Sequence, residues 1–92
     1  MPGRINTWQS LWGSGRLAGL RGDLSQEEKL LRQALWLGQK EEGSENLELG
    51  ILLLDLAECL EKQEKDEARD FYRQAQELLV SNAKRLGVIK KP

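Results

Sequence analysis

Hydrophobic residues recur at helical spacing in three stretches of this chain, and the stretches between them are polar. The first pattern predicts a helix over residues 25–39. Ser25 and Glu28 have the spacing of a capping box, in which a side-chain oxygen and a carboxylate three residues later close the helix start. The polar stretch 40–44 predicts a loop. The apolar positions of this helix are Leu30, Leu31, Ala34, Leu35 and Leu37.

The second stretch, residues 45–63, is the most hydrophobic part of the chain and contains the run Ile51-Leu52-Leu53-Leu54. Successive residues of a helix point about 100° apart, so this helix must be covered on two sides. At least one of the four residues is predicted to stay exposed unless something covers it. The candidates are another chain, the Trp8–Trp12 segment folding back, or a bound peptide.

A third helix is predicted over residues 65–85, with Phe71 and Tyr72 on its apolar stripe and Gly87 near its end. The connection between the second and third helices is very short. Two long amphipathic helices joined so tightly pack as antiparallel neighbours, which predicts a helical hairpin over residues 45–85. The expected fold is all-α.

The chain also repeats itself. The segment Glu27–Leu37 recurs 41 residues later as Ala68–Leu78, with four identical positions and the same apolar spacing. Such a period is typical of helical arrays in which each unit leaves a hydrophobic face for its neighbour. The repeat predicts a binding or assembly module.

The start of the chain fits this pattern less well. Its glycines, among them Gly13, Gly15 and Gly19, each weaken a helix by about 1 kcal/mol relative to Ala. We therefore expect residues 1–22 to be irregular or partly helical, and residues 23–92 to form the helical domain. Residues 1–22 carry three Arg and no acid, which leaves a mitochondrial targeting segment as an alternative to a cytoplasmic protein.

Composition and charge narrow the classes of partner. The net charge of −1 provides no overall field for nucleic acid or an anionic membrane. The longest apolar run is far shorter than the roughly 20 residues that span a bilayer. A single thiol, Cys59, forms no internal disulfide and fits a reducing compartment. The expectation is a cytoplasmic protein without nucleic-acid or membrane partners.

The side chains available for chemistry argue against an enzyme. The chain has no histidine, which is the commonest general base and metal ligand. Cys59 lies in the most apolar helix and is expected to be an inert core residue. The acids Asp66, Glu67 and Asp70 lie where they favour the dipole of the third helix, which explains them without a metal. We expect no catalytic residue, no cofactor and no metal.

The hairpin predicted for residues 45–85 resembles a tetratricopeptide repeat of the longer kind found in kinesin light chains. The resemblance rests on Leu56-Ala57 in the first helix and on Glu67-Ala68, Tyr72 and Ala75 in the second. It implies that the alanines let the helices approach closely and that Tyr72 fills the space between repeats. The first unit matches through Leu31 and Ala34, but Glu27 replaces a small residue. The implied array has about 1.5–2 units.

In that family the first helix of each repeat lines a concave groove. The resemblance therefore implies a non-catalytic scaffold that binds a partner protein or peptide, with an apolar or basic helix as the best match. Because the array is so short, its exposed end is expected to be covered, either by a second copy of the chain (a homo-oligomer) or by the partner. The alternative is a three-helix bundle similar to the microtubule-interacting-and-trafficking domain, acting as an adaptor or subunit of a trafficking or organelle complex. The partner-binding candidates are Ile51, Leu54, Asp55, Glu58, Glu61 and Lys62, together with Trp8 and Trp12. The two tryptophans Trp8 and Trp12 could equally belong to an interface or to the core. Trp36 is assigned to the core.

Overall fold

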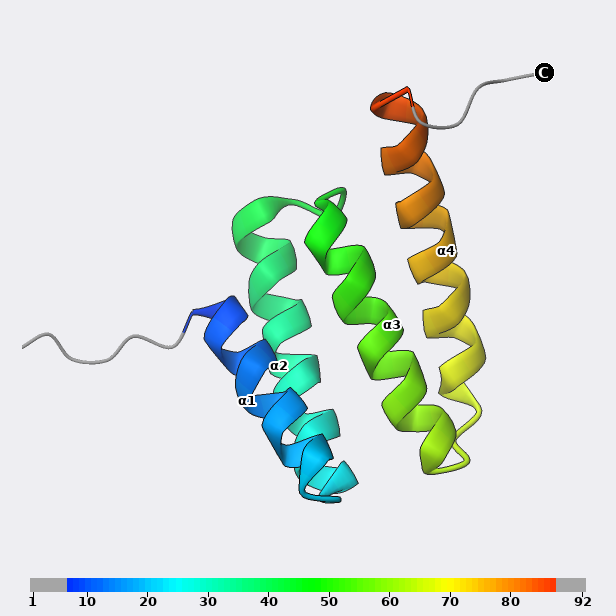
Figure 1. Ribbon diagram of the computed structural model, residues 1–92. Helices are drawn as coiled ribbons and strands as arrows, with labels where there is room; N and C mark the ends of the chain where they lie inside the picture. Colours follow the sequence, from blue (N-terminus) through cyan, green and yellow to red (C-terminus); the bar gives the residue numbers. More distant parts are fainter. Residues whose placement is uncertain (1–6, 88–92) are drawn as a thin grey trace, which may run out of the picture.

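The computed structural model describes residues 7–87 and folds them into α-helices joined by short turns (Figure 1). The described part contains no strand, so the all-α prediction is confirmed. No helix in this part is long and apolar enough to cross a membrane. The helices are α1 (Trp8–Leu20), α2 (Leu24–Glu42), α3 (Leu47–Lys62) and α4 (Glu67–Arg85).

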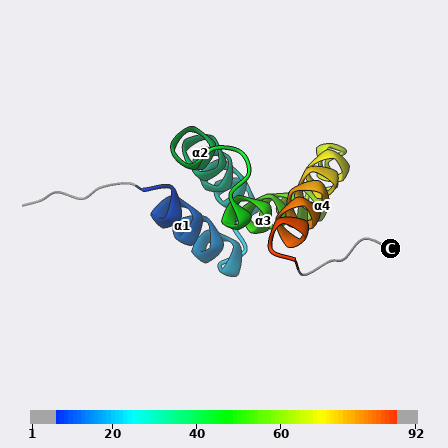
Figure 2. The ribbon, with the colours of Figure 1, turned by 90° about the horizontal axis from the view of Figure 1, so that it is seen from above.

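Consecutive helices run antiparallel and pack in chain order. α1 packs on α2, α2 on α3, and α3 on α4. Seen from above, α3 lies between the α1–α2 hairpin and α4 (Figure 2). The hairpin predicted for residues 45–85 is confirmed as α3 and α4, and α1 and α2 form a second one.

The hydrophobic core is built around α3, as its apolar run predicts. Leu52 and Leu53 are buried, and Leu54 is partly buried against the core. Ile51 is 40% exposed, so the prediction that one residue of this run stays uncovered is confirmed. The Trp8–Trp12 segment does fold back onto the core, where Trp8 is fully buried.

The glycines of α1 explain why the sequence understated this helix. A Cβ atom at Gly15 would lie 2.9 Å from Leu31 Cδ2, and one at Gly19 would lie 2.6 Å from the Glu27 carboxylate. These positions therefore need glycine because α1 approaches α2 closely, and that packing offsets the low helix propensity. Residues 8–20, predicted as irregular or partly helical, form a full helix; residues 1–6 lie outside the described part.

Both predicted boundaries of α2 were wrong by a few residues. The N-cap of α2 is Asp23, whose side chain accepts a hydrogen bond from the Gln26 amide at 3.1 Å, and Ser25 lies within the first turn. The positive φ of Gly22 turns the chain sharply and presents Asp23 at this position. α2 also continues through Glu42, because charged residues can extend a helix whose other face is already packed.

Candidate functional site

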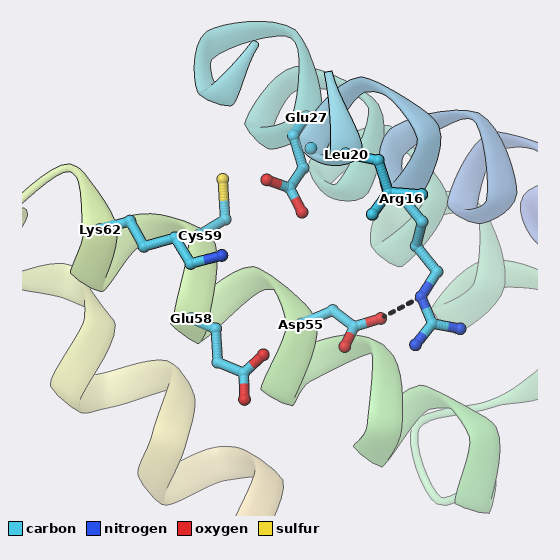
Figure 3. A pocket seen from close by; sticks show the side chains of 8 residues that line it. Arg16, Leu20, Glu27, Asp55, Glu58, Cys59 and Lys62 are labelled. Carbon is cyan, nitrogen blue, oxygen red and sulfur yellow. Dashed lines mark ion pairs between the residues drawn. The ribbon is translucent and has the colours of Figure 1, made fainter. Parts of the chain in front are cut away.

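The molecular surface is hollowed between α1 and α3, with one wall completed by α2. This hollow, called here the α1–α3 groove, has a volume of about 460 Å³. Five of its eight lining residues are charged (Figure 3). The lining residues are Arg16, Gly19 and Leu20 of α1, Glu27 of α2, and Asp55, Glu58, Cys59 and Lys62 of α3.

Helical spacing brings the α3 side chains of the groove together. Asp55, Glu58 and Lys62 follow one another at intervals of three and four residues, so they share one face of the helix. Ile51, one turn before Asp55, continues the same face and is exposed. On α1, Arg16 and Leu20 have the same four-residue spacing.

Asp55 fixes α1 against α3. Its Oδ2 accepts a hydrogen bond from the Trp12 indole N–H at 2.7 Å and lies 3.3 Å from Arg16 Nε. The Asp55 side chain is only 15% exposed, whereas that of Arg16 is 60% exposed, so the hydrogen bond from Trp12 is the better shielded of the two interactions. Trp12 in turn stacks on Trp8, with ring centroids 5.9 Å apart. The Asp55 carboxylate is therefore already bound by side chains of the protein itself, Trp12 and Arg16.

Glu27 presents the opposite case. Its Oε1 is buried and has no hydrogen-bond partner among the described residues. The carboxylate lies over Gly19, where no side chain competes for the space. Figure 3 shows it pointing into the space between α1 and α3. An unpaired buried carboxylate oxygen is costly, so a donor that enters the groove and displaces the atoms covering Oε1 would stabilise it.

Cys59 lies beside Glu27 and is a core residue, as predicted. The thiol is 3.4 Å from the Leu24 carbonyl oxygen, to which it donates a hydrogen bond. Burial, and then the neighbouring Glu27 carboxylate, raises the pKa of Cys59 to about 12. The thiol stays protonated at neutral pH, which makes it a poor nucleophile and a poor metal ligand. Within residues 7–87 no cluster of His, Cys, Asp and Glu is arranged to hold a metal ion.

The predicted partner-binding residues fall into separate places. Asp55, Glu58 and Lys62 line the groove, and Ile51 lies next to it. Glu61 is bound to the Tyr72 hydroxyl, which donates a hydrogen bond at 2.6 Å. This hydrogen bond and partial burial raise the pKa of Tyr72 to about 12.

The two tryptophans of α1 also differ from each other. Trp8 is 1% exposed and belongs to the core, so it is not presented at the surface. Its indole N–H lies 3.3 Å from Glu42 Oε2. Trp12 is partly buried and holds Asp55 in place. Trp12 is therefore linked to the groove through Asp55, whereas Trp8 packs near Gly38 and Leu49.

Sequence reasoning missed the α1 and α2 side of the groove. Arg16, Leu20 and Glu27 line it, but the first two stand in the segment predicted as irregular or partly helical. The four-residue spacing of Trp8, Trp12, Arg16 and Leu20 was the available signal, because it places all four along one side of a helix.

Comparison with known proteins adds no further identification. No family model, no curated protein and no solved structure matches this chain. The groove and its side chains therefore carry the functional interpretation.

Proposed function

We propose that this domain is a non-catalytic module that binds a peptide segment of a partner protein in the α1–α3 groove. The observation that carries the proposal is the Glu27 carboxylate in the lining of an open groove of about 460 Å³, with its Oε1 buried and without a hydrogen-bond partner among residues 7–87. A donor on the bound segment would satisfy this oxygen. The inert thiol of Cys59 argues against catalysis there and fits a reducing compartment such as the cytoplasm.

The charges of the groove favour a basic ligand. Arg16 is already bound to Asp55, which leaves the carboxylates of Glu27 and Glu58 beside one amine, that of Lys62. A Lys or Arg side chain entering the groove would form charge-assisted hydrogen bonds with these carboxylates. The exposed Leu20 and Ile51 offer apolar contact at the rim. The preferred segment combines a basic residue with an apolar one, presented on one face of a helix.

Packing of the tetratricopeptide type remains our proposal for these helices, and two features are compatible with it. Two antiparallel hairpins follow each other, and the small residues Ala57, Ala68 and Ala75 are all buried. A three-helix bundle would not need α1, which here closes one side of the groove. A second copy could occupy the groove in place of a partner, and sedimentation distinguishes the two.

A random library of displayed 16-residue peptides, selected on the full chain, tests the proposal. Peptides that bind the groove should be enriched in Lys and Arg. Their affinity should fall at least about tenfold for Glu27→Gln and Glu58→Lys, which corresponds to about 1.4 kcal/mol. Glu77→Lys is the matched control, because it makes the same charge change on the exposed face of α4.

Circular dichroism would verify that each variant is folded. Selected peptides without basic enrichment, or basic peptides that bind Glu27→Gln and Glu58→Lys unchanged, would contradict the proposal. A dimer in sedimentation that Glu58→Lys dissociates would assign the groove to a second copy instead.

A further inference from the structure

A second hollow, called here the Trp36 hollow, lies on the α1–α2 hairpin. Its volume is about 440 Å³, and its lining is mainly apolar. It shares no lining residue with the α1–α3 groove. The lining residues are Leu11 of α1 and Arg32, Gln33, Trp36 and Leu37 of α2.

Trp36 is the largest apolar side chain left at the surface of the described residues. It is 63% exposed, so its assignment to the core was wrong. The reason is its position on α2: it stands one turn after Arg32 and one turn before Lys40, on the side away from the buried Leu31 and Leu35. Lys40 Nζ lies 4.8 Å from the ring centroid and covers part of the indole. An exposed Trp of this kind is typical of binding hot spots.

The charged residues that α1 and residues 29–40 of α2 contribute near the Trp36 hollow are all basic. α1 contains no acid, and residues 29–40 of α2 contain Lys29, Arg32 and Lys40 but no acid. Arg32 is engaged by Glu28 at 2.8 Å and by Glu67 at 2.7 Å. Lys29 and Lys40 make no ion pair within residues 7–87. Their positive charge is available to a partner.

We propose that the Trp36 hollow is a second docking surface, for an acidic amphipathic helix of a partner protein. A large apolar side chain of that helix packs against Trp36, Leu37 and Leu11, and its carboxylates meet Lys29 and Lys40. Lys29 and Lys40 are eleven residues apart along α2, which is on the order of 16 Å. A parallel or antiparallel helix would therefore carry its acids three turns apart, on either side of the apolar anchor.

The two surfaces then select ligands of opposite charge. The α1–α3 groove offers carboxylates to a base, whereas the Trp36 hollow offers ammonium groups to an acid. One domain could hold two segments at once, because no residue is shared between the two linings. The Trp36 hollow does not depend on the proposed role of the groove.

The same peptide library, sorted on the full chain and on surface variants, separates the two sites. A class of binders should be enriched in Asp and Glu together with Leu, Phe or Trp. Its affinity should fall at least about tenfold for Trp36→Ala, as for the removal of a hot spot, and severalfold for Lys40→Glu. Binding should also weaken as salt rises. Glu58→Lys should leave this class unchanged.

Leu17→Ala provides the matched control, since Leu17 is 56% exposed on α1 and lines neither site. Trp36→Ala removes an exposed side chain, so circular dichroism should show an unchanged helical signal. The proposal fails if no selected peptide depends on Trp36, or if those that do are neutral or basic. A single-stranded oligothymidine that binds with Trp36 dependence, in the absence of such acidic peptides, would also overturn it.

Discussion

α2 and α4 contain the two copies of the repeat, yet the protein uses them differently. In α2 the matched positions Leu31 and Ala34 are both 0% exposed. In α4 Ala75 is equally buried, but Tyr72, the counterpart of Leu31, is only partly buried. The difference follows from neighbours: α2 packs against α1 and α3, whereas α4 packs mainly against α3. Two helices with the same hydrophobic pattern bury the same side chains only if each has a neighbouring helix on both sides.

α2 and α4 also differ in which helix provides the glycine at their close contact with α3. A Cβ at Gly38 of α2 would lie 2.6 Å from Leu49 of α3, so α2 provides the gap and α3 the side chain. Between α3 and α4 the gap is at Gly50, where a Cβ would lie 2.8 Å from Leu79. Leu79 stands 41 residues after Gly38 and takes the opposite role. The repeat therefore preserves which face of the helix packs, but equivalent positions need not make the same contact.

The largest expected effect contrasts Leu31 with Tyr72. Leu31→Ala removes a fully buried side chain between three helices and should lower the free energy of unfolding by about 3–5 kcal/mol. Tyr72→Ala removes a partly buried ring and its hydrogen bond to Glu61, and should cost about 2 kcal/mol. Urea unfolding followed by circular dichroism measures both. Equal losses would mean that α4 is covered by another chain in solution.

The next effect concerns Glu28, whose counterpart in α4 is the exposed Arg69. Burial alone would raise the pKa of Glu28, but hydrogen bonds from Lys65, Arg32 and Gln63 lower it to about 2. A carboxyl whose pKa is lowered by folding stabilises the protein above its unfolded pKa, near 4.5, and loses that contribution as the pH falls toward 2. We expect a contribution of about 2 kcal/mol, discounted because Arg32 and Lys65 are partly exposed.

Urea unfolding at a series of pH values from 7 to 2 tests the role of Glu28. The wild-type protein should lose stability below pH 4.5, and Glu28→Gln should show a shallower loss from a lower starting value. Glu67→Gln is the control, because Glu67 also binds Arg32 but its side chain is 56% exposed. Parallel pH profiles for wild type and Glu28→Gln would remove Glu28 from the acid response.

The same contrast explains what sequence reasoning could reach. The apolar run of α3 and the short turn before α4 predicted the central helix and its hairpin, because both signals are local. The exposure of Trp36 and the burial of Trp8 depend on which helices are adjacent, which no local pattern records. α1 was understated because Gly15 and Gly19 read as helix-weakening, although each makes room for an α2 side chain. Because α1 was not predicted as a full helix, the side of the groove that α1 forms was not predicted either.

A smaller effect separates glycines that make room from glycines that do not. Gly38→Ala should lower stability by about 1 kcal/mol, because the strain against Leu49 and Trp8 exceeds the gain in helix propensity. Gly13→Ala is the matched control within α1: nothing lies within 4 Å of its Cβ, so it should raise stability by about 0.5–1 kcal/mol. Thermal and urea unfolding measure the two signs. Stabilisation by Gly38→Ala would mean that Leu49 and Trp8 repack without cost.

The smallest expected change in stability tests whether α4 closes the array. Gln76 and Glu77 of α4 stand where α2 has Leu35 and Trp36, and both are exposed. Replacing them with the α2 residues, as Gln76→Leu and Glu77→Trp, should change the free energy of unfolding by less than about 0.5 kcal/mol, since neither side chain is packed. It should nevertheless create an apolar patch on α4, made of one position that α2 buries (Leu35) and one that α2 leaves exposed (Trp36), and sedimentation should then show association that grows with concentration. The reverse change, Leu35→Gln, should instead destabilise the monomer, because Leu35 is 9% exposed in the core. If the double variant of α4 stayed monomeric at every concentration, the polar residues of α4 would not be what ends the array.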